Sequence, residues 1–280
     1  MLHAIKVAYD GTRFHGSQRQ GSTDPGSVEG SIVEALREIE QFDPEEEWPV
    51  KFASRTDSGV SALGNVFSVR SDMDPENLLK ALNANMEGIW CWAHGLPRET
   101  QNIRWASSRW YRYHLPASSL VTGEVSRLDK IMKTFLGEHD FTNFSKPEDE
   151  KNTVTIIEKA EVIDLSGSGD LVAVDIVGSR FLWQQVRRMV GAGMAVLEGR
   201  LSSEDVKVLM DPSRSDVDEL RKEVRTMPPF GLILMDVHFK DIAFSIVPEA
   251  LELALERSKE EAWKAATRVL IDSALRSLPR

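Results

Sequence analysis

Residues 4–39 read AIKVAYDGTRFHGSQRQGSTDPGSVEGSIVEALREI, and this stretch begins the pattern that the rest of the chain follows. Residues 4–9 alternate in the manner of a strand. A polar, Gly-rich segment follows over 10–26. Ser27 can then cap a helix, because apolar residues recur at helical spacing from Val28 to Ile39. The stretch therefore predicts a strand, a long polar loop and a helix.

The chain continues with two series of strands and helices in the same order. In the first series we expect further strands at 50–53, 65–70 and 89–93 and a helix at 74–86, which begins with the cap Asp74 before Pro75. The second series has predicted strands at 109–115, 153–165, 171–177 and 232–239, the last of these closing the sheet. Its predicted helices are one capped by Ser126, one over 181–198 ended by Gly199, and one beginning at Ser202 or Ser203.

This repeated order, β-α-β-β-α-β, predicts the fold class. We expect an α+β protein with two split-βαβ halves of the ferredoxin or RRM type, whose mainly antiparallel sheets flank a central catalytic cleft. The expected domains are residues 1–103 and 104–247, followed by a helical tail over 248–280.

The composition limits the possible functions. The chain has 280 residues with 34 Lys+Arg and 44 Asp+Glu, so its net charge of −10 argues against indiscriminate nucleic-acid binding, but not against a local basic cleft. Cys91 is the single cysteine, so an internal disulfide is excluded and a structural zinc site is not expected. The apolar runs are too short to cross a membrane, and we expect a soluble cytoplasmic protein.

Two N-terminal segments carry candidate functional groups. Residues 9–20 supply hydrogen-bond donors suited to phosphates or base edges, namely Arg13, Gln18, Arg19 and Gln20. A solvated connection between strand and helix explains the same segment. Residues 53–60 place Asp57 beside Arg55 before a Gly turn, where the carboxylate could act as nucleophile or base. The alternative is an Asx-turn, in which Asp57 accepts backbone hydrogen bonds.

Two later segments add aromatic and basic groups. Residues 104–114 interleave arginines with aromatic rings that could stack on bases, and a strand would place Arg109, Tyr111 and Tyr113 on one face. A half-buried strand whose polar face is exposed to solvent explains these residues equally well. In residues 180–191, helical spacing assigns Trp183 to the core and leaves a polar stripe containing Arg187. No dinucleotide, P-loop, zinc-protease or serine-hydrolase motif occurs, so we expect no cofactor and no metal.

Taken in order, these segments resemble the TruA-type tRNA pseudouridine synthases over residues 4–238. The four segments are similar to that family's YDGT-x-F-x-G-x-Q-x-Q, GRTDAGVHA, R-x-Y-x-Y and F-x-x-x-x-VR-x-x-VG motifs. Residues 136–144, LGEHDFTNF, resemble the family's LGEHDFTSF, and residues 229–232, PFGL, lie where a proline and Gly-Leu precede its last strand.

The resemblance implies an activity and assigns roles. It implies isomerisation of uridine to pseudouridine in the tRNA anticodon stem-loop, at tRNA positions 38–40, by a homodimer without a cofactor. Asp57 matches the catalytic aspartate, which acts as nucleophile or base toward the ribose or the uracil ring. Tyr111 matches the active-site tyrosine, and Arg187 matches the arginine paired with the aspartate. Arg55 matches the position associated with base flipping. The remaining RNA-binding residues that we expect are Arg13, Gln18, Arg19, Gln20, Arg104, Arg109, Arg112, Tyr113 and Arg188.

The sequence departs from the family at several positions, among them Ser17, Ser54, Ser58 and Ser61, and Gln101 or Asn102 occupies the region where many members have a His. The proposed catalytic residues are kept, so we expect an active enzyme. Two alternatives are a non-catalytic RNA-binding or chaperone protein on the same scaffold and a glycosidic-bond hydrolase that uses Asp57.

The charge is unevenly distributed along the chain. Residues 98–114 contain four Arg and one acid, as do residues 180–200. Acidic residues gather elsewhere, for example over 38–47. We therefore expect a basic, aromatic cleft within an acidic exterior, which would limit non-specific RNA binding.

Overall fold

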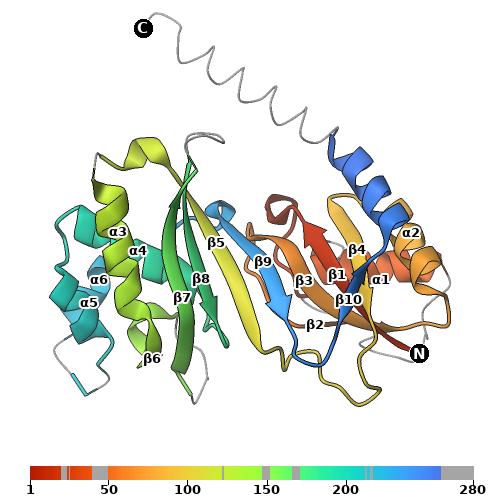
Figure 1. Ribbon diagram of the computed structural model, residues 1–280, viewed down its shortest axis with the longest axis horizontal. Coiled ribbons are helices and arrows are strands. Elements are labelled where there is room, and N and C mark those ends of the chain that lie inside the picture. The colour runs from red at the N-terminus through yellow and green to blue at the C-terminus, as the bar shows by residue number, and fades with distance from the viewer. Residues whose placement is uncertain are drawn as a thin grey trace, which may run out of the picture.

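The computed structural model describes residues 1–19, 24, 26–39, 50–121, 123–146, 152–165, 171–211, 213–214 and 217–259. Within them the protein is a mixed α+β fold around one large, mostly antiparallel sheet (Figure 1). The strands are β1 (Leu2–Tyr9), β2 (Lys51–Phe52), β3 (Ser61–Arg70), β4 (Ile89–Gly95), β5 (Ser108–Pro116), β6 (Gly137–Asp140), β7 (Val154–Asp164), β8 (Leu171–Gly178), β9 (Leu232–His238) and β10 (Phe244–Ile246).

The sheet is continuous from one end of the molecule to the other. Its strand order is β10-β4-β1-β3-β9-β5-β8-β7-β6, and β2 pairs with β3 off this path. The parallel pairing of Ser61 and Ala62 with Ile233 and Leu234 joins β3 to β9, whereas the other pairs are antiparallel. Strands from the two halves of the sequence therefore meet at the centre of the sheet.

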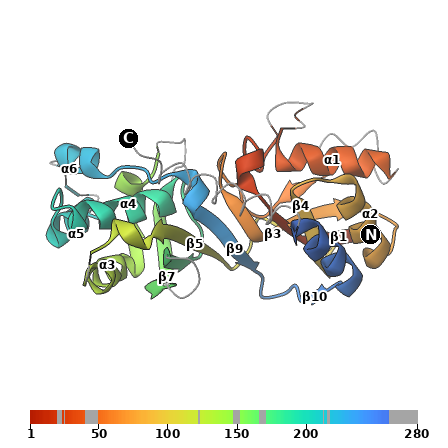
Figure 2. The same ribbon diagram turned by 90° about the horizontal axis from the view of Figure 1, so that it is seen from above.

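The helices gather at the two ends of the sheet. Figures 1 and 2 show α1, α2 and the helical residues 248–259 around one end and α3 to α6 around the other, with β3, β9 and β5 between the two groups. The helices are α1 (Val28–Glu38), α2 (Pro75–Asn85), α3 (Glu124–Met132), α4 (Gln185–Leu197), α5 (Ser203–Leu209) and α6 (Asp218–Glu223). The central strands thus lie between the two groups of helices.

Several predicted helix starts are confirmed. The Ser27 hydroxyl accepts a hydrogen bond from the Gly30 N–H, and the Asp74 carboxylate accepts from two N–H groups in the turn after Pro75. Ser202 and Asp205 form a reciprocal capping box at α5. Each cap satisfies N–H groups that have no partner within the helix.

Three predictions about elements are corrected. Helix α3 begins at Glu124 rather than after Ser126, because the Glu124 carboxylate accepts the Val121 N–H at 2.8 Å and sets the first turn earlier. Helix α4 begins at Gln185 rather than at residue 181, for a reason given with the site. Strand β9 is not the last strand, because β10 follows it and pairs with β4.

The described part of the C-terminal tail packs against the N-terminal part of the chain. Residues 248–259 are helical, and Ala250 is buried. The Asn83 side chain donates to the Ala250 carbonyl, and the Arg257 guanidinium donates to carbonyls of Asn83 and Met86 at the end of α2. The prediction of a helical tail beyond residue 259 lies outside the described residues.

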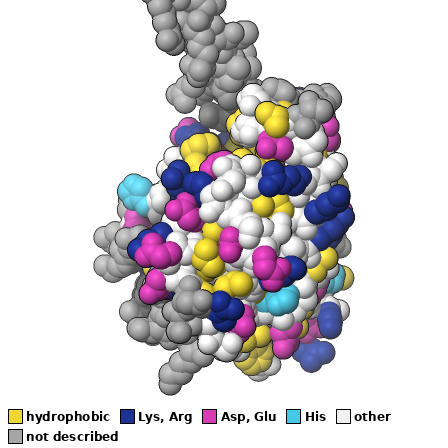
Figure 3. Space-filling view, turned by 90° about the vertical axis from the view of Figure 1, so that its left-hand side faces the viewer, with side chains coloured by type: hydrophobic (Ala, Val, Ile, Leu, Met, Phe, Trp, Pro, Cys, Tyr) yellow, Lys and Arg dark blue, Asp and Glu magenta, His cyan; other side chains and the backbone are white. Residues whose placement is uncertain are grey.

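The surface is of mixed charge at one end of the molecule. On the face over α3, α5 and α6, basic and acidic side chains are interspersed (Figure 3). No described helix has the length and apolar composition that crossing a bilayer requires.

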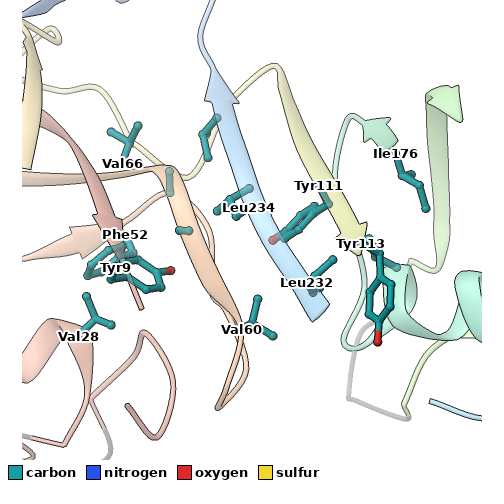
Figure 4. Packing of buried hydrophobic residues seen from close by; sticks show 14 of the residues in the cluster. Tyr9, Val28, Phe52, Val60, Val66, Tyr111, Tyr113, Ile176, Leu232 and Leu234 are labelled. Atoms are coloured by element: carbon teal, nitrogen blue, oxygen red, sulfur yellow. The ribbon is translucent and has the colours of Figure 1, made fainter. Parts of the chain in front are cut away.

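At the centre of the sheet, Tyr111 of β5 lies beside Leu234 of β9, and Val60 extends this apolar row toward β3 (Figure 4). These buried residues support the floor of the site.

Candidate active site

A cleft of about 770 Å³ lies over the central strands and is lined by residues from both halves of the sequence. Asp57, Tyr111 and Arg187, the three residues expected to be catalytic, all line it. Among the described residues, its other charged lining residues include five more arginines and no further acid, so the predicted basic cleft is present. Those arginines are Arg19, Arg55, Arg104, Arg109 and Arg180.

The loop that carries Asp57 is held by the first motif segment. Gly16 forms a β-bridge with Asp57 and has φ 127°, a conformation that side-chain-bearing residues rarely adopt. The Ser17 hydroxyl accepts the Thr56 N–H at 2.8 Å, and the buried Tyr9 hydroxyl lies 2.8 Å from Thr56 Oγ1. Ser17, one of the departures from the family pattern, therefore supports the Asp57 loop.

The Asp57 carboxylate contacts two donors, one from the turn before α4 and one from the first turn of α4. Its Oδ2 accepts from Arg187 Nη1 at 2.9 Å, and its Oδ1 accepts from Trp183 Nε1 at 2.9 Å. The Asp57 side chain is 28% exposed and that of Arg187 is 11% exposed. Arg187 Nε also donates to the Met227 carbonyl at 2.7 Å, which orients the guanidinium. The arrangement leaves the carboxylate reachable from the cleft while its charge is compensated.

Trp183 is the site residue that sequence reasoning missed. The assumption of a helix from residue 181 placed its ring in the core, but the ring is half-buried in the cleft. The helix starts later because Gln184 has φ 63°, a left-handed conformation that ends the helical path before Gln185. The one feature of the sequence that could have indicated Trp183 as a site residue was its position, four residues before Arg187.

Tyr111 and Tyr113 lie on the same face of β5, as the period of a strand predicts. The Tyr111 ring meets Phe181 edge-on at 5.2 Å between centroids. Burial raises the pKa of the Tyr111 phenol further above physiological pH, where it is already neutral, so the hydroxyl can donate a hydrogen bond and the ring can stack. Burial also raises the pKa of Tyr113 to about 12, and its hydroxyl donates to the Pro228 carbonyl.

The expected RNA-binding residues separate into those that line the cleft and those that do not. Arg55 and Arg104 are exposed and line it, as do Gln18, Arg19 and Arg109. Arg109, however, uses its donors on backbone carbonyls, with Nη1 on Ser179 and Nη2 on Arg104, both at 2.7 Å. Arg109 therefore ties the edge of the cleft together.

The other expected residues lie elsewhere. Arg112 points to the opposite face of the sheet from Tyr111 and makes a bidentate pair with the buried Asp175, at 2.6 and 2.8 Å. Arg13 pairs with Glu87, and neither Tyr113 nor Arg188 lines the cleft. Burial lowers the pKa of the Arg188 guanidinium, and the nearby Arg221 adds to this shift. Gln20 lies outside the described residues.

One acidic residue near the cleft was not expected to be functional. Glu29 of α1 is buried, and its carboxylate accepts the Arg19 N–H at 3.1 Å. Burial raises the pKa of this carboxyl, whereas Arg19, Arg104 and Arg55 act in the opposite direction. Glu29 therefore anchors the segment that carries Gln18 and Arg19. No group of His, Cys, Asp or Glu suited to a metal ion occurs among the described residues.

Known proteins resemble this chain over most of its length. Residues 131–240 match the family described as tRNA pseudouridine synthase. The chain is 38% identical over 265 residues to tRNA pseudouridine synthase A of Pyrococcus abyssi, covering 94% of both proteins. It is 39% identical over 253 residues to the protein of the same name from Pyrococcus horikoshii, covering 90% of both. A third relative of that name, from Methanococcoides burtonii, is 35% identical over 241 residues, covering 85% of this chain and 83% of the relative.

Proposed function

Since the chain belongs to the family of tRNA pseudouridine synthases A and isomerises uridine to pseudouridine in tRNA, we propose that it acts on the anticodon stem-loop with the residues of this cleft. The observation that carries the assignment of the site is the contact between Asp57 and Arg187 beside Tyr111. These residues are far apart in sequence and meet in one basic cleft.

The target uridine enters the cleft after it leaves the base stack. A volume of about 770 Å³ falls within the range of about 300–1,000 Å³ that holds small ligands. It suits one extruded nucleotide and excludes a duplex, and extrusion costs a few kcal/mol. Arginines along the cleft neutralise the flanking phosphates and so compensate part of this cost.

The reaction itself requires few groups. The bond between ribose C1′ and uracil N1 breaks, the uracil turns, and its C5 bonds to C1′. C5 loses a proton and N1 gains one, so the overall change is an isomerisation. Asp57 acts as nucleophile or general base, and Arg187 compensates its charge. Tyr111, a phenol that is neutral at physiological pH, stacks on the uracil or assists the proton transfer at C5.

The exposed aromatic residue beside Arg104 adds a stacking surface. Trp105 is 82% exposed, while Ile103 two positions earlier is buried and anchors the turn. The Trp105 backbone N–H donates to the Asn102 carbonyl at 3.0 Å, and the Arg109 guanidinium donates to the Arg104 carbonyl. An exposed indole on a held backbone next to a basic cleft is suited to an unpaired base of the RNA.

The two halves of the chain correspond to two split-βαβ units, residues 1–103 and 104–247, followed by the tail 248–280, with the exception that β10 of the second range pairs with β4 of the first. The support is the strand order, because β1 lies between β4 and β3 and β5 lies between β9 and β8. In each half the strand that precedes the second inner strand pairs with it, since β2 pairs with β3 and β7 pairs with β8. Hydrogen exchange tests this division, since two units would show two levels of protection.

The family resemblance also supports a cytoplasmic homodimer. The dimer is tested by sedimentation at micromolar protein concentration, where a monomeric mass would contradict it.

The site of modification is tested by incubating the purified protein with unmodified tRNA transcripts and mapping pseudouridine by chemical labelling. We expect pseudouridine in the anticodon stem-loop, at positions 38–40. Pseudouridine confined to another arm of the tRNA would contradict the proposed site. Tight binding without isomerisation would indicate an RNA-binding protein, and release of free uracil would indicate a hydrolase.

Arg55 provides a test of RNA gripping, because it is exposed, lines the cleft and lies two residues before Asp57. For Arg55→Ala we expect kcat/KM to fall by about 10- to 100-fold, since a group that stabilises the flipped nucleotide offsets a cost of a few kcal/mol. The slope of log affinity against log salt should also decrease by about 1.

The matched control is Arg70→Ala, because Arg70 is exposed and pairs with Glu99 away from the cleft. Equal effects of the two variants would show that Arg55 contributes only to general charge.

A further inference from the structure

Trp183 and Arg187 divide the two oxygens of the Asp57 carboxylate between them. The indole N–H binds Oδ1 and the guanidinium binds Oδ2, both at 2.9 Å. A carboxylate held by one donor can still rotate about its terminal bond, because that torsion has a broad profile. Two donors from different directions restrict this rotation.

The indole also contacts Lys146, and hydrogen bonds hold the backbone around it. Lys146 Nζ lies 4.0 Å from the centroid of the Trp183 rings, a cation–π distance, and the Lys146 N–H donates to the Trp183 carbonyl at 3.0 Å. The backbone before the helix is held as well, because the Gln185 side chain accepts the Leu182 N–H at 2.8 Å and donates to Thr155 Oγ1. The turn around Trp183 is thus closed by specific contacts.

The backbone of this turn is strained. Gln184 is the one non-glycine residue with positive φ in the described part of the chain, and such a conformation costs about 1–3 kcal/mol. A continuous helix through residues 181–184 would avoid this cost, but it would change the direction of the Trp183 side chain. The strain is therefore retained where it directs the indole toward Asp57.

We propose that Trp183 is a positioning residue of the isomerisation, which orients the Asp57 carboxylate so that Oδ1 is the oxygen that reacts. A hydrogen bond from a charged donor is about twice as strong as one from a neutral donor. Oδ2, bound by the guanidinium, is therefore the less reactive oxygen, and Oδ1, bound by a neutral indole, retains more of its nucleophilicity. This inference rests on the proposed role of Asp57.

The decisive comparison is Trp183→Phe against Trp183→His. Phenylalanine keeps an aromatic ring but loses the N–H. In histidine, Nε2 occupies the ring position that Nε1 occupies in tryptophan, so a donor is restored. For Trp183→Phe we expect kcat to fall by about 10- to 100-fold, which is the effect of losing one hydrogen bond to a charged group. The KM for tRNA should stay within about 3-fold of that of the unmodified protein. For Trp183→His we expect kcat to recover to within about 3-fold of the unmodified protein.

The matched control is Trp92→Phe, because the Trp92 indole also donates one hydrogen bond, to the Leu63 carbonyl, but away from the cleft. It should leave kcat and KM unchanged. Thermal unfolding of each variant identifies effects that come from folding. Should Trp183→Phe not fold, Trp183→His decides alone, and loss of its activity in the folded state overturns the proposal.

A Trp183→Phe variant that keeps its kcat also overturns the role of Trp183. If its KM rises at the same time, the indole is a substrate contact instead. Failure of the Asp57 assignment is recognised separately, since an active Asp57→Asn variant would remove the reacting carboxylate from the scheme whatever Trp183 does.

Discussion

Asp57→Asn is expected to reduce pseudouridine formation by at least about 1,000-fold, because the amide keeps the size of the side chain but loses the charge and the basicity of the carboxylate. Binding of tRNA should remain within a few-fold, since the arginines of the cleft are unchanged. The rate is measured by single-turnover conversion in purified tRNA, and binding is measured by filter retention.

Asp72→Asn is a suitable control, because the Asp72 side chain is fully exposed and lies outside the cleft. A folded Asp57→Asn variant that still converts uridine at a comparable rate would exclude Asp57 as nucleophile or base. Loss of tRNA binding along with the activity would instead give Asp57 a role in binding.

Arg187→Met is expected to have the second largest effect, a fall of about 100-fold in kcat. The variant leaves the Asp57 carboxylate without its ion pair and frees it to leave the orientation set by Trp183. Stability should fall as well, because the Met227 carbonyl loses its donor. We expect the free energy of unfolding to decrease by about 1–3 kcal/mol, less than for a fully buried pair, since Asp57 is 28% exposed.

Arg187→Lys separates charge from geometry. Lysine keeps the positive charge but cannot bind the Asp57 carboxylate and the Met227 carbonyl at the same time through one planar group. We therefore expect its kcat to lie between those of Arg187→Met and the unmodified protein. Chemical denaturation and single-turnover kinetics measure the two effects. A variant with normal kcat and lower stability would show that Arg187 acts only as a structural residue.

Most of the order of strands and helices could be predicted from the sequence because the signals are local, although the short strands β6 and β10 were not predicted. Ser27, Asp74 and Ser202 cap helices through N–H groups within three positions of themselves. The alternation of β5 likewise predicted that Tyr111 and Tyr113 share a face. Such features depend on the period of the backbone and on neighbouring residues, which a sequence displays directly.

The start of α4 could not be predicted in this way. Residues 181–184 have the apolar spacing of a helix, yet Gln184 adopts a left-handed conformation and turns Trp183 toward the Asp57 loop. The contact that favours this turn comes from a carboxylate 126 residues earlier in the chain. A local pattern contains no information about such a partner.

The sequence by itself determined the α+β class, most of the element order, the family and the residue types available for chemistry. Only the tertiary structure decided how they are used. It places β3 beside β9 and so brings Asp57 against Arg187 and Trp183, it commits Arg109 to backbone carbonyls, and it pairs Arg112 with Asp175 on the opposite face of the sheet. The physical reason is that periodicity sets which way a side chain points, whereas the partner it meets depends on elements brought together by folding.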